Sequence, residues 1–448
     1  MKYWHLQMHL PWGRNEEEID PVEMLNNAAP FIGIHKWEDK QYYDFLNVEE
    51  NTIVMVRKGN QPIALCKIIS EPYEDKELEA TYLHTHYRDV KVLGWAKDYP
   101  VETPAHLFSQ KTFLSCNDTT KQFKYINDWL KYIKRNEKMT DALSLLNKKN
   151  NIILQGAPGT GKTYSTASMA ISLINPKFNN KDDHSKIMDE YNKLLIKINS
   201  NAETAGTSSK GIITSGQIGF ITFHQSLEYE DFIEGIKPIS NGSNVSYVIE
   251  NGIFKMLARK AAEDTSNKYV LIIDEINRGN VSKILGELIT LLEPDKRSDK
   301  EHPITVTLPY SKEAFSVPSN LYIIGTMNTT DRSVGSIDYA IRRRFAFVTL
   351  EADKNIVESN SSKLALDLYN DVQKFIEDNK DSEFDIEDLR IGHSYFLVDK
   401  NDNGAQLEQR WKYEILPLLR EYYKDGIITK DIPESSRTIN TFRSYVNE

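Results

Sequence analysis

A glycine-rich stretch in the middle of the chain constrains the fold more than any other feature. Residues 156–163 read GAPGTGKT, directly after the apolar run at 152–154 and before a segment of helical character. A strand, a glycine-rich loop and a helix in this order form a phosphate-binding loop, in which backbone amides and the helix N-terminus converge on phosphate groups. The pattern predicts an α/β domain with a parallel sheet that binds a nucleoside triphosphate.

Every residue type that such a loop needs is present. Lys162 is expected to reach the β- and γ-phosphates, and the hydroxyl of Thr163 is expected to bind Mg²⁺. The remaining loop residues are expected to surround the phosphates with their backbone: Gly156, Pro158, Gly159, Thr160 and Gly161.

Two further apolar runs end in polar side chains. The run at 269–273 leads into Asp274 and Glu275, and the run that begins at 321 ends at Asn328. Ligands of parallel sheets lie beyond the carboxyl ends of the strands. Asp274 is therefore expected to hold Mg²⁺ through water and Glu275 to polarise the attacking water. The amide of Asn328 is expected to orient that water or to sense the γ-phosphate.

Three consecutive arginines follow in the sequence DYAIRRRF at 338–345. Arg342, Arg343 and Arg344 cannot all face one side of a helix, so at least one projects elsewhere. At a subunit boundary it would reach the γ-phosphate of the next subunit as an arginine finger. The sequence does not say which of the three does so, and a solvated basic patch is the alternative.

Composition and the placement of aromatic residues divide the chain. Five of the six tryptophans lie before residue 130, and β-branched runs at 52–57 and 63–69 flank a turn, which predicts a hairpin. The stretch 175–217 is polar and predicts a helix plus a loop, and the chain after 350 is mostly helical in pattern. We predict a β-rich domain at 1–112, a helical linker at 113–149, a nucleotide-binding domain at 150–350 and a helical lid at 351–448.

Charge and cysteine content exclude several classes of protein. The formal net charge of −10 argues against indiscriminate nucleic-acid binding. Only two cysteines, Cys66 and Cys116, are present, which fits a reducing compartment. The sequence shows neither a long apolar segment nor a signal-peptide pattern, so we expect a cytoplasmic protein that does not span a membrane.

Beyond the general nucleotide-binding set, six phrases characterise the second half of the chain. They are FITFHQSLEYEDFIEGIKP at 220–238, DEINRGNVSKILGELITLLEPDKR at 274–297, TLPYSKEAFSV at 307–317, GTMNTTDRS at 325–333, IGHSYF at 391–396 and WKYEILPLLREYY at 411–423. As a set they resemble the McrB family of AAA+ proteins, the motor subunits of McrBC modification-dependent restriction systems.

The resemblance implies properties that the spacing of residues does not. It implies a ring, a hexamer in this family, that hydrolyses GTP with Mg²⁺ (ATP is the alternative) and acts with a separate McrC-like nuclease whose inserted arm stimulates hydrolysis. It implies that Asn277 helps to position the catalytic water in response to that partner. The family signature Asn-Thr-x-Asp ends here at Asp331, which is expected beside the nucleotide. His393 and Arg390 lie where a second sensor is expected, and a packing role for His393 is equally open.

The N-terminal region loosely resembles small β barrels of the PUA type, EVE and YTH-like domains, over FIGIHKW at 31–37 and the two hairpin strands. Such domains hold a flipped modified base in an aromatic cage. Trp12, Trp37 and Trp95 are the cage candidates, although a tryptophan in a small β domain is usually part of the core. A B3-like or unrelated DNA reader remains open. Four basic residues either contact phosphates or are merely solvated: Arg14, Arg57, Lys58 and Arg88.

The leading hypothesis is a GTP-driven motor subunit that recognises modified double-stranded DNA and drives a separate nuclease. The E-x-K triplets at 38–40 and 74–76 lack the strand and upstream aspartate of a nuclease site, so cleavage is expected to need the partner. One alternative is an ATP-dependent remodelling protein similar to MoxR-type AAA+ proteins, with a protein-binding N-terminal domain. Another is a nucleotide-switched scaffold, against which Glu275 and the arginine run argue.

Overall fold

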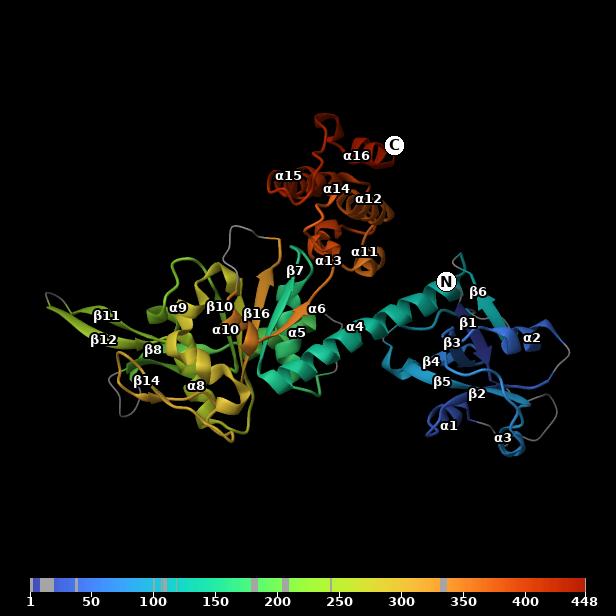
Figure 1. Ribbon diagram of the computed structural model, residues 1–448, viewed down its shortest axis with the longest axis horizontal. Helices are drawn as coiled ribbons and strands as arrows, with labels where there is room; N and C mark the ends of the chain where they lie inside the picture. The colour runs from blue at the N-terminus through green and yellow to red at the C-terminus, as the bar shows by residue number, and fades with distance from the viewer. Residues whose placement is uncertain are drawn as a thin grey trace. The chain divides into compact units, whose positions relative to one another are not determined.

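The computed structural model contains two compact units, Met1–Lys138 and Met139–Glu448, and the boundary falls inside the long helix α4 (Lys121–Lys149) (Figure 1). The structure describes residues 3–8, 20–36, 39–99, 101–105, 107, 111–117, 119–178, 184–203, 209–241, 244–330 and 337–447.

The first unit is built on one six-stranded sheet in the order β2-β5-β4-β3-β1-β6. β1 runs parallel to β3 and the other neighbours are antiparallel. The strands are β1 (Tyr3–Gln7), β2 (Phe31–Ile34), β3 (Ile53–Lys58), β4 (Gln61–Ile68), β5 (His86–Trp95) and β6 (Phe113–Cys116). Three short helices accompany them: α1 (Pro21–Leu25), α2 (Lys40–Asn47) and α3 (Lys76–Tyr82). The predicted hairpin is confirmed as β3 and β4.

Both faces of this sheet are buried. Alternate residues of a strand point to opposite faces. Val54 and Val56 of β3 join one apolar cluster, whereas Met55 joins another that includes Trp129 of α4. The first half of α4 covers one of these two faces.

The region predicted as a helical linker, 113–149, begins with a strand. β6 pairs with β1, with Phe113 opposite Leu6 and Cys116 opposite Tyr3. Phe113 and Cys116 of this strand are buried, and the two residues between them are half-buried. The sheet of the first unit therefore extends past residue 112.

The second unit contains a five-stranded sheet in the order β10-β13-β16-β7-β17, and every neighbouring pair is parallel. Its strands are β7 (Asn151–Gly156), β10 (Ile218–Thr222), β13 (Tyr269–Asp274), β16 (Leu321–Asn328) and β17 (Ala346–Thr349). Helices of this part include α5 (Lys162–Ile174), α6 (His184–Leu194), α7 (Tyr229–Phe232), α8 (Ile253–Glu263), α9 (Val281–Leu285) and α10 (Tyr339–Arg344). The predicted parallel α/β domain is confirmed.

Two apolar clusters enclose this sheet. Leu271 and Ile273 of β13 pack with α8, whereas Val270 and Ile272 pack with α5. Strands buried on both faces read as continuous apolar runs, which explains the sequence pattern at 269–273.

The stretch 175–217 contains more structure than the predicted helix plus loop. Besides α6 it forms β8 (Lys197–Glu203) and β9 (Ser209–Ser215), which join β11 (Glu234–Asn241) and β12 (Asn244–Asn251) in a sheet of order β11-β12-β9-β8. The prediction missed these strands because their composition is polar, although Ile213 is buried in the apolar cluster beside α8.

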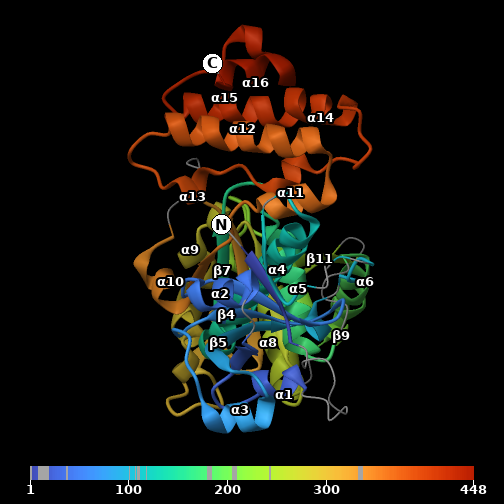
Figure 2. The ribbon, with the colours of Figure 1, turned by 90° about the vertical axis from the view of Figure 1, so that its right-hand side faces the viewer.

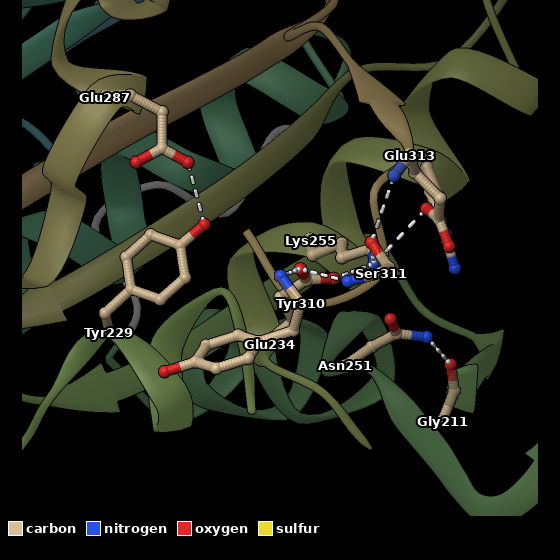
Figure 3. A network of polar contacts seen from close by, with 10 residues as sticks. Gly211, Tyr229, Glu234, Asn251, Lys255, Glu287, Tyr310, Ser311 and Glu313 are labelled. Atoms are coloured by element: carbon tan, nitrogen blue, oxygen red, sulfur yellow. Dashed lines mark hydrogen bonds and ion pairs between the residues drawn. The ribbon is translucent and has the colours of Figure 1, made fainter. Parts of the chain in front are cut away.

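A buried polar network holds the β11–β12 hairpin at its root (Figure 3). The ammonium of Lys255 lies 2.5 Å from Oε2 of Glu234, and neither side chain is exposed to solvent. Glu234 also accepts hydrogen bonds from the backbone N–H groups of Tyr310 and Ser311. Burial alone would raise the pKa of Glu234, but the bonds from Lys255 and Ser311 outweigh it and lower the pKa. Loss of one partner of such a pair costs about 3–5 kcal/mol, because the other charge is left buried without compensation.

The same network reaches a second, smaller hairpin. Glu313 lies 3.2 Å from the ammonium of Lys255 and also pairs with Arg259. Glu313 stands just before β15 (Ala314–Phe315), which pairs with β14 (Val306–Thr307). Two acids and two bases thus connect both hairpins to α8.

The lid is a group of helices with an apolar core of its own (Figure 2). Its helices are α11 (Lys354–Asn360), α12 (Lys363–Asn379), α13 (Ile386–Leu389), α14 (Ala405–Arg410), α15 (Leu416–Lys424) and α16 (Ile439–Asn447). A π-helical turn, Trp411–Ile415, joins α14 to α15, and Trp411 is fully buried against Phe442. In the described part of the chain, no helix has both the length and the apolar composition of a membrane span.

Candidate active site

The glycine-rich loop lies between the end of β7 and the start of α5. Gly159 and Gly161 have φ values of 78° and 80°, in the left-handed region that favours glycine. Gly161 immediately precedes the first turn of α5, so the N–H groups of that turn face the loop. Within the loop, the hydroxyl of Thr160 donates to the carbonyl of Ala157 at 3.0 Å. The backbone therefore has the curled form that binds phosphate.

A segment of the lid, residues 392–394, is bonded directly to this loop, and we call it the lid strap. The N–H of Gly392 donates to the carbonyl of Pro158 at 2.9 Å, and the N–H of Ser394 donates to that of Gly159 at 3.1 Å. A Cβ atom on Gly392 would overlap the backbone of Gly159. Only glycine at position 392 allows the strap to approach so closely.

Lys162 is buried at the first turn of α5. Its ammonium donates to the carbonyls of Gly156 and Ala157, at 2.9 and 2.8 Å. Desolvation lowers the pKa of Lys162 to about 8, against the opposing effect of Glu275 and Asp274. The cation thus lies at the loop that would hold the phosphates.

Thr163 and Asp274 supply the oxygen atoms that suit Mg²⁺ together with phosphate. Thr163 is exposed in the first turn of α5, and Asp274 is half-buried at the carboxyl end of β13. The described residues contain no cluster of three or more His, Cys, Asp or Glu side chains that could hold a metal ion. A cation here would need the hydroxyl, one carboxylate and phosphate oxygens, as in other phosphate-binding loops.

Glu275 adopts a left-handed backbone conformation, with φ 52° and ψ 47°. Its Oε1 accepts a hydrogen bond from the side-chain amide of Asn328 at 2.7 Å, and its Oε2 lies 3.3 Å from Nε of Arg278. A non-glycine residue in this region is uncommon and often marks a functional site. The structure therefore brings the predicted water-polarising acid and the strand-end amide into direct contact.

Thr326 was not among the residues predicted from the sequence. Its hydroxyl donates a hydrogen bond to Oδ1 of Asp274 at 2.6 Å. The period of two along a strand carried a signal, because Thr326 and Asn328 lie on the same face of β16. Asn328 was recognised from its place at the strand end, whereas Thr326 lies within an apolar run.

Asn277 lies two residues after Glu275 and is buried, and its Oδ1 has no hydrogen-bond partner among the described residues. A buried oxygen without a partner is costly, so it is suited to receive a donor that arrives with a ligand or partner. Asp331 lies outside the described residues.

The three arginines of α10 have different surroundings. Arg344 is half-buried, lies 2.7 Å from a carboxylate oxygen of Glu293 and donates to the carbonyl of Ala340. Arg342 is exposed, and its guanidinium lies over the ring of Phe347. The side chain of Arg343 is exposed and forms no hydrogen bond or ion pair with any described residue. Of the three, Arg343 is the most available to a neighbouring subunit.

The two lid residues considered as a second sensor differ in position. His393 belongs to the lid strap, is buried, and accepts a hydrogen bond from the N–H of Asp353 at 3.3 Å. Arg390 points to Glu377 of α12 across 3.6 Å. His393 therefore stands at the phosphate-binding loop, whereas Arg390 interacts within the lid.

Of the three tryptophans considered for an aromatic cage, Trp95 lies among the residues that the structure describes. Trp95 is half-buried at the end of β5, packs against the apolar cluster of β3 and β4, and has Lys97 over its ring at 5.9 Å. Trp12 and Trp37 lie outside the described residues.

Two of the basic residues considered for phosphate contacts are structural. Arg57 and Arg88 are each 1% exposed, and both donate to backbone carbonyls. Their guanidinium groups face inward because β3 and β5 place these residues on buried faces, so in this structure neither side chain is available to a phosphate and neither is solvated. Lys58 is exposed, and Arg14 lies outside the described residues.

The middle residue of each acidic triplet caps a helix. The carboxylates of Asp39 and Asp75 accept hydrogen bonds from the first turns of α2 and α3, so they are helix caps.

Comparisons with known proteins agree with this geometry. Residues 210–345 match the family described as AAA domain (dynein-related subfamily), and residues 367–429 match the McrB alpha-helical lid domain. A chain of the BchI–BchD complex of magnesium chelatase shares 16% identity over 47% of this chain and 57% of its own length. Its TM-score of 0.26 is too low to carry an argument.

Two curated relatives are restriction proteins. The type IV methyl-directed restriction enzyme EcoKMcrB subunit of Escherichia coli (strain K12) is 36% identical over 307 residues, which is 63% of this chain and 56% of that protein. The type II restriction enzyme BsuMI component YdiS of Bacillus subtilis (strain 168) is 31% identical over 150 residues, 32% of this chain and 42% of that protein.

The chain thus spans just over half the length of the first relative. The parallel sheet with its phosphate-binding loop, the helical lid with its own family match, and the identity to EcoKMcrB all indicate the same group. In its AAA domain and its helical lid, the chain is of the McrB type of AAA+ protein.

Proposed function

We propose that this protein is the GTP-hydrolysing motor subunit of a type IV, McrBC-like restriction complex. In this proposal the first unit recognises modified double-stranded DNA, and hydrolysis drives a separate McrC-like nuclease. The observation that carries the proposal is the contact between Glu275 and Asn328, at the strand ends where Asp274 and the phosphate-binding loop also lie. The rest is supported by the similarity to the E. coli relative, which is a subunit of a type IV methyl-directed restriction enzyme.

Each residue of the site would have one role in hydrolysis. Lys162 would leave the loop carbonyls to neutralise the β- and γ-phosphates. Glu275 would polarise the attacking water, and Asn328, which bonds its carboxylate, would hold it in place. Mg²⁺ bound by Thr163 and Asp274 would offset charge on the phosphate oxygens. The protein's own contribution is therefore positioning and electrostatic stabilisation.

A ring of subunits would complete the site. AAA+ sites of this kind receive an arginine from the neighbouring subunit, and the exposed Arg343 would supply it. The unpartnered Oδ1 of Asn277 would receive a donor when the nuclease partner engages. GTP rather than ATP, and a hexamer rather than another ring size, follow from the family resemblance.

The first test is steady-state hydrolysis of GTP and ATP, with and without the McrC-like partner. We expect turnover that prefers GTP and rises with the partner. Glu275→Gln should bind nucleotide but turn over at least roughly 100-fold more slowly, because an amide cannot polarise water as a carboxylate does. Glu301→Gln, at an exposed site outside the loop region, is the matched control.

Near-normal turnover by Glu275→Gln would move the catalytic role to another residue. Turnover that prefers ATP and ignores the partner would instead favour a MoxR-like remodelling ATPase.

The second test separates the arginines. Arg343→Ala should fold normally and lose turnover, because it would remove the trans-acting cation. Arg344→Ala should lower the thermal unfolding temperature, because it breaks the half-buried pair with Glu293. Mixing Arg343→Ala with Lys162→Ala should restore part of the activity, since each variant supplies the group that the other lacks. An active Arg343→Ala, or a mixture that stays inactive, would contradict action in trans by this residue.

The third test concerns DNA. At matched salt, the full chain should bind duplexes that carry a modified base more tightly than otherwise identical unmodified duplexes. Trp95→Ala should reduce this preference if the indole stacks on the flipped base, and Trp95→Phe should retain part of it. Equal affinity of the native chain for both duplexes would rule out modified-base recognition. A preference that Trp95→Ala leaves intact would remove Trp95 from the cage.

A further inference from the structure

The hydroxyl of Thr326 joins the two acids of the site. Thr326 lies on β16 and is 2% exposed. Its Oγ1 donates to Oδ1 of Asp274 at 2.6 Å and accepts a hydrogen bond from the backbone N–H of Glu275 at 3.1 Å. One hydroxyl thus contacts the side chain of the metal-binding candidate and the backbone of the catalytic candidate.

The backbone at Glu275 needs such a partner. β13 ends at Asp274, and Glu275 turns into the left-handed region with φ 52°. A buried N–H group at a strand end must find another acceptor. A hydroxyl can accept this bond and donate a second one at the same time, which a carbonyl or an amide nitrogen cannot do.

The bond to Asp274 has a consequence for the metal site. Thr326 engages Oδ1 and leaves Oδ2 for other ligands. A carboxylate held by a hydrogen bond from the surrounding protein presents its free oxygen in a defined direction, and such supporting bonds tune metal affinity. Loss of the hydroxyl would let the carboxylate rotate.

We propose that Thr326 is a positioning residue that orients the carboxylate of Asp274 toward Mg²⁺ and holds the backbone of Glu275 in its left-handed conformation. Its side chain is buried and acts through the two acids. This inference rests on the proposed nucleoside triphosphatase function and adds a residue to the same site.

Three variants of the full chain isolate the hydroxyl. Thr326→Val keeps the shape and removes the hydroxyl, Thr326→Ser keeps the hydroxyl and removes the methyl group, and Thr326→Ala replaces the valine variant if that variant does not fold. The probe is a non-hydrolysable GTP analogue, bound with and without Mg²⁺. Amide hydrogen exchange of the peptide covering 274–278 reports the bond to the N–H of Glu275 directly.

For Thr326→Val we expect binding without Mg²⁺ within about twofold of native, because the phosphate-binding loop is intact. The factor by which Mg²⁺ tightens binding should fall roughly tenfold, and kcat should fall roughly 10- to 100-fold, since hydrogen bonds to charged groups carry energies of that order. Exchange at 274–278 should be faster. Thr326→Ser should behave like the native chain in every assay.

Native-like Mg²⁺ dependence and exchange in a folded Thr326→Val would overturn the proposal. So would a Thr326→Ser variant as impaired as Thr326→Val, because packing of the methyl group would then explain the effect. A native chain that hydrolyses neither GTP nor ATP would overturn the proposed function alone. The exchange measurement at Glu275 would still decide whether Thr326 positions it.

Discussion

The register of three parallel strands determines where every chemical group of the site lies. β16 pairs with β7 so that Asn328 stands opposite Gly156, and it pairs with β13 so that Gly325 stands opposite Ile273. This register places the phosphate-binding loop, the strand-end amide and the two acids at one edge of the sheet. A slip by one residue would exchange side chains between the two apolar clusters on either face and shift the strand-end residues relative to the phosphate-binding loop. Packing of the core and geometry of the site are therefore maintained together.

The lid adds a second constraint on the same loop. The lid strap bonds to the carbonyls of Pro158 and Gly159, and Gly392 allows that approach. A nucleotide that reshapes the loop would act on the lid through backbone hydrogen bonds. Those bonds do not depend on the identity of most side chains. Because these hydrogen bonds connect the phosphate-binding loop directly to the lid, a change in the loop on phosphate binding would be passed to the lid.

Much of the site could be predicted because its signals are local. A strand, a glycine-rich loop and a helix in sequence specify the surroundings of Lys162, and an apolar run that ends in two acids specifies the position of Asp274. The role of Thr326 could not be predicted, because it depends on a neighbouring strand that is distant in sequence. The inward orientation of Arg57 and Arg88 could not be predicted, because a basic residue in a strand does not reveal which face of the sheet is buried. The difference between Arg343 and Arg344 likewise depends on Glu293, which the sequence around the arginines does not contain.

The loop is expected to bind a nucleoside triphosphate through Lys162. The protons exchanged on binding test this most directly. Burial lowers the pKa of Lys162 to about 8 in the free chain, and a bound triphosphate would raise it by favouring the charged ammonium. Binding of a non-hydrolysable GTP analogue, measured by calorimetry at about pH 8 in buffers of different ionisation enthalpy, should therefore take up protons. Its affinity should fall as pH rises through about 8, and Lys162→Met should show weak binding without proton uptake. If the analogue bound Lys162→Met as tightly as the native chain, or bound the native chain without proton uptake, Lys162 would not be the group that binds the phosphates.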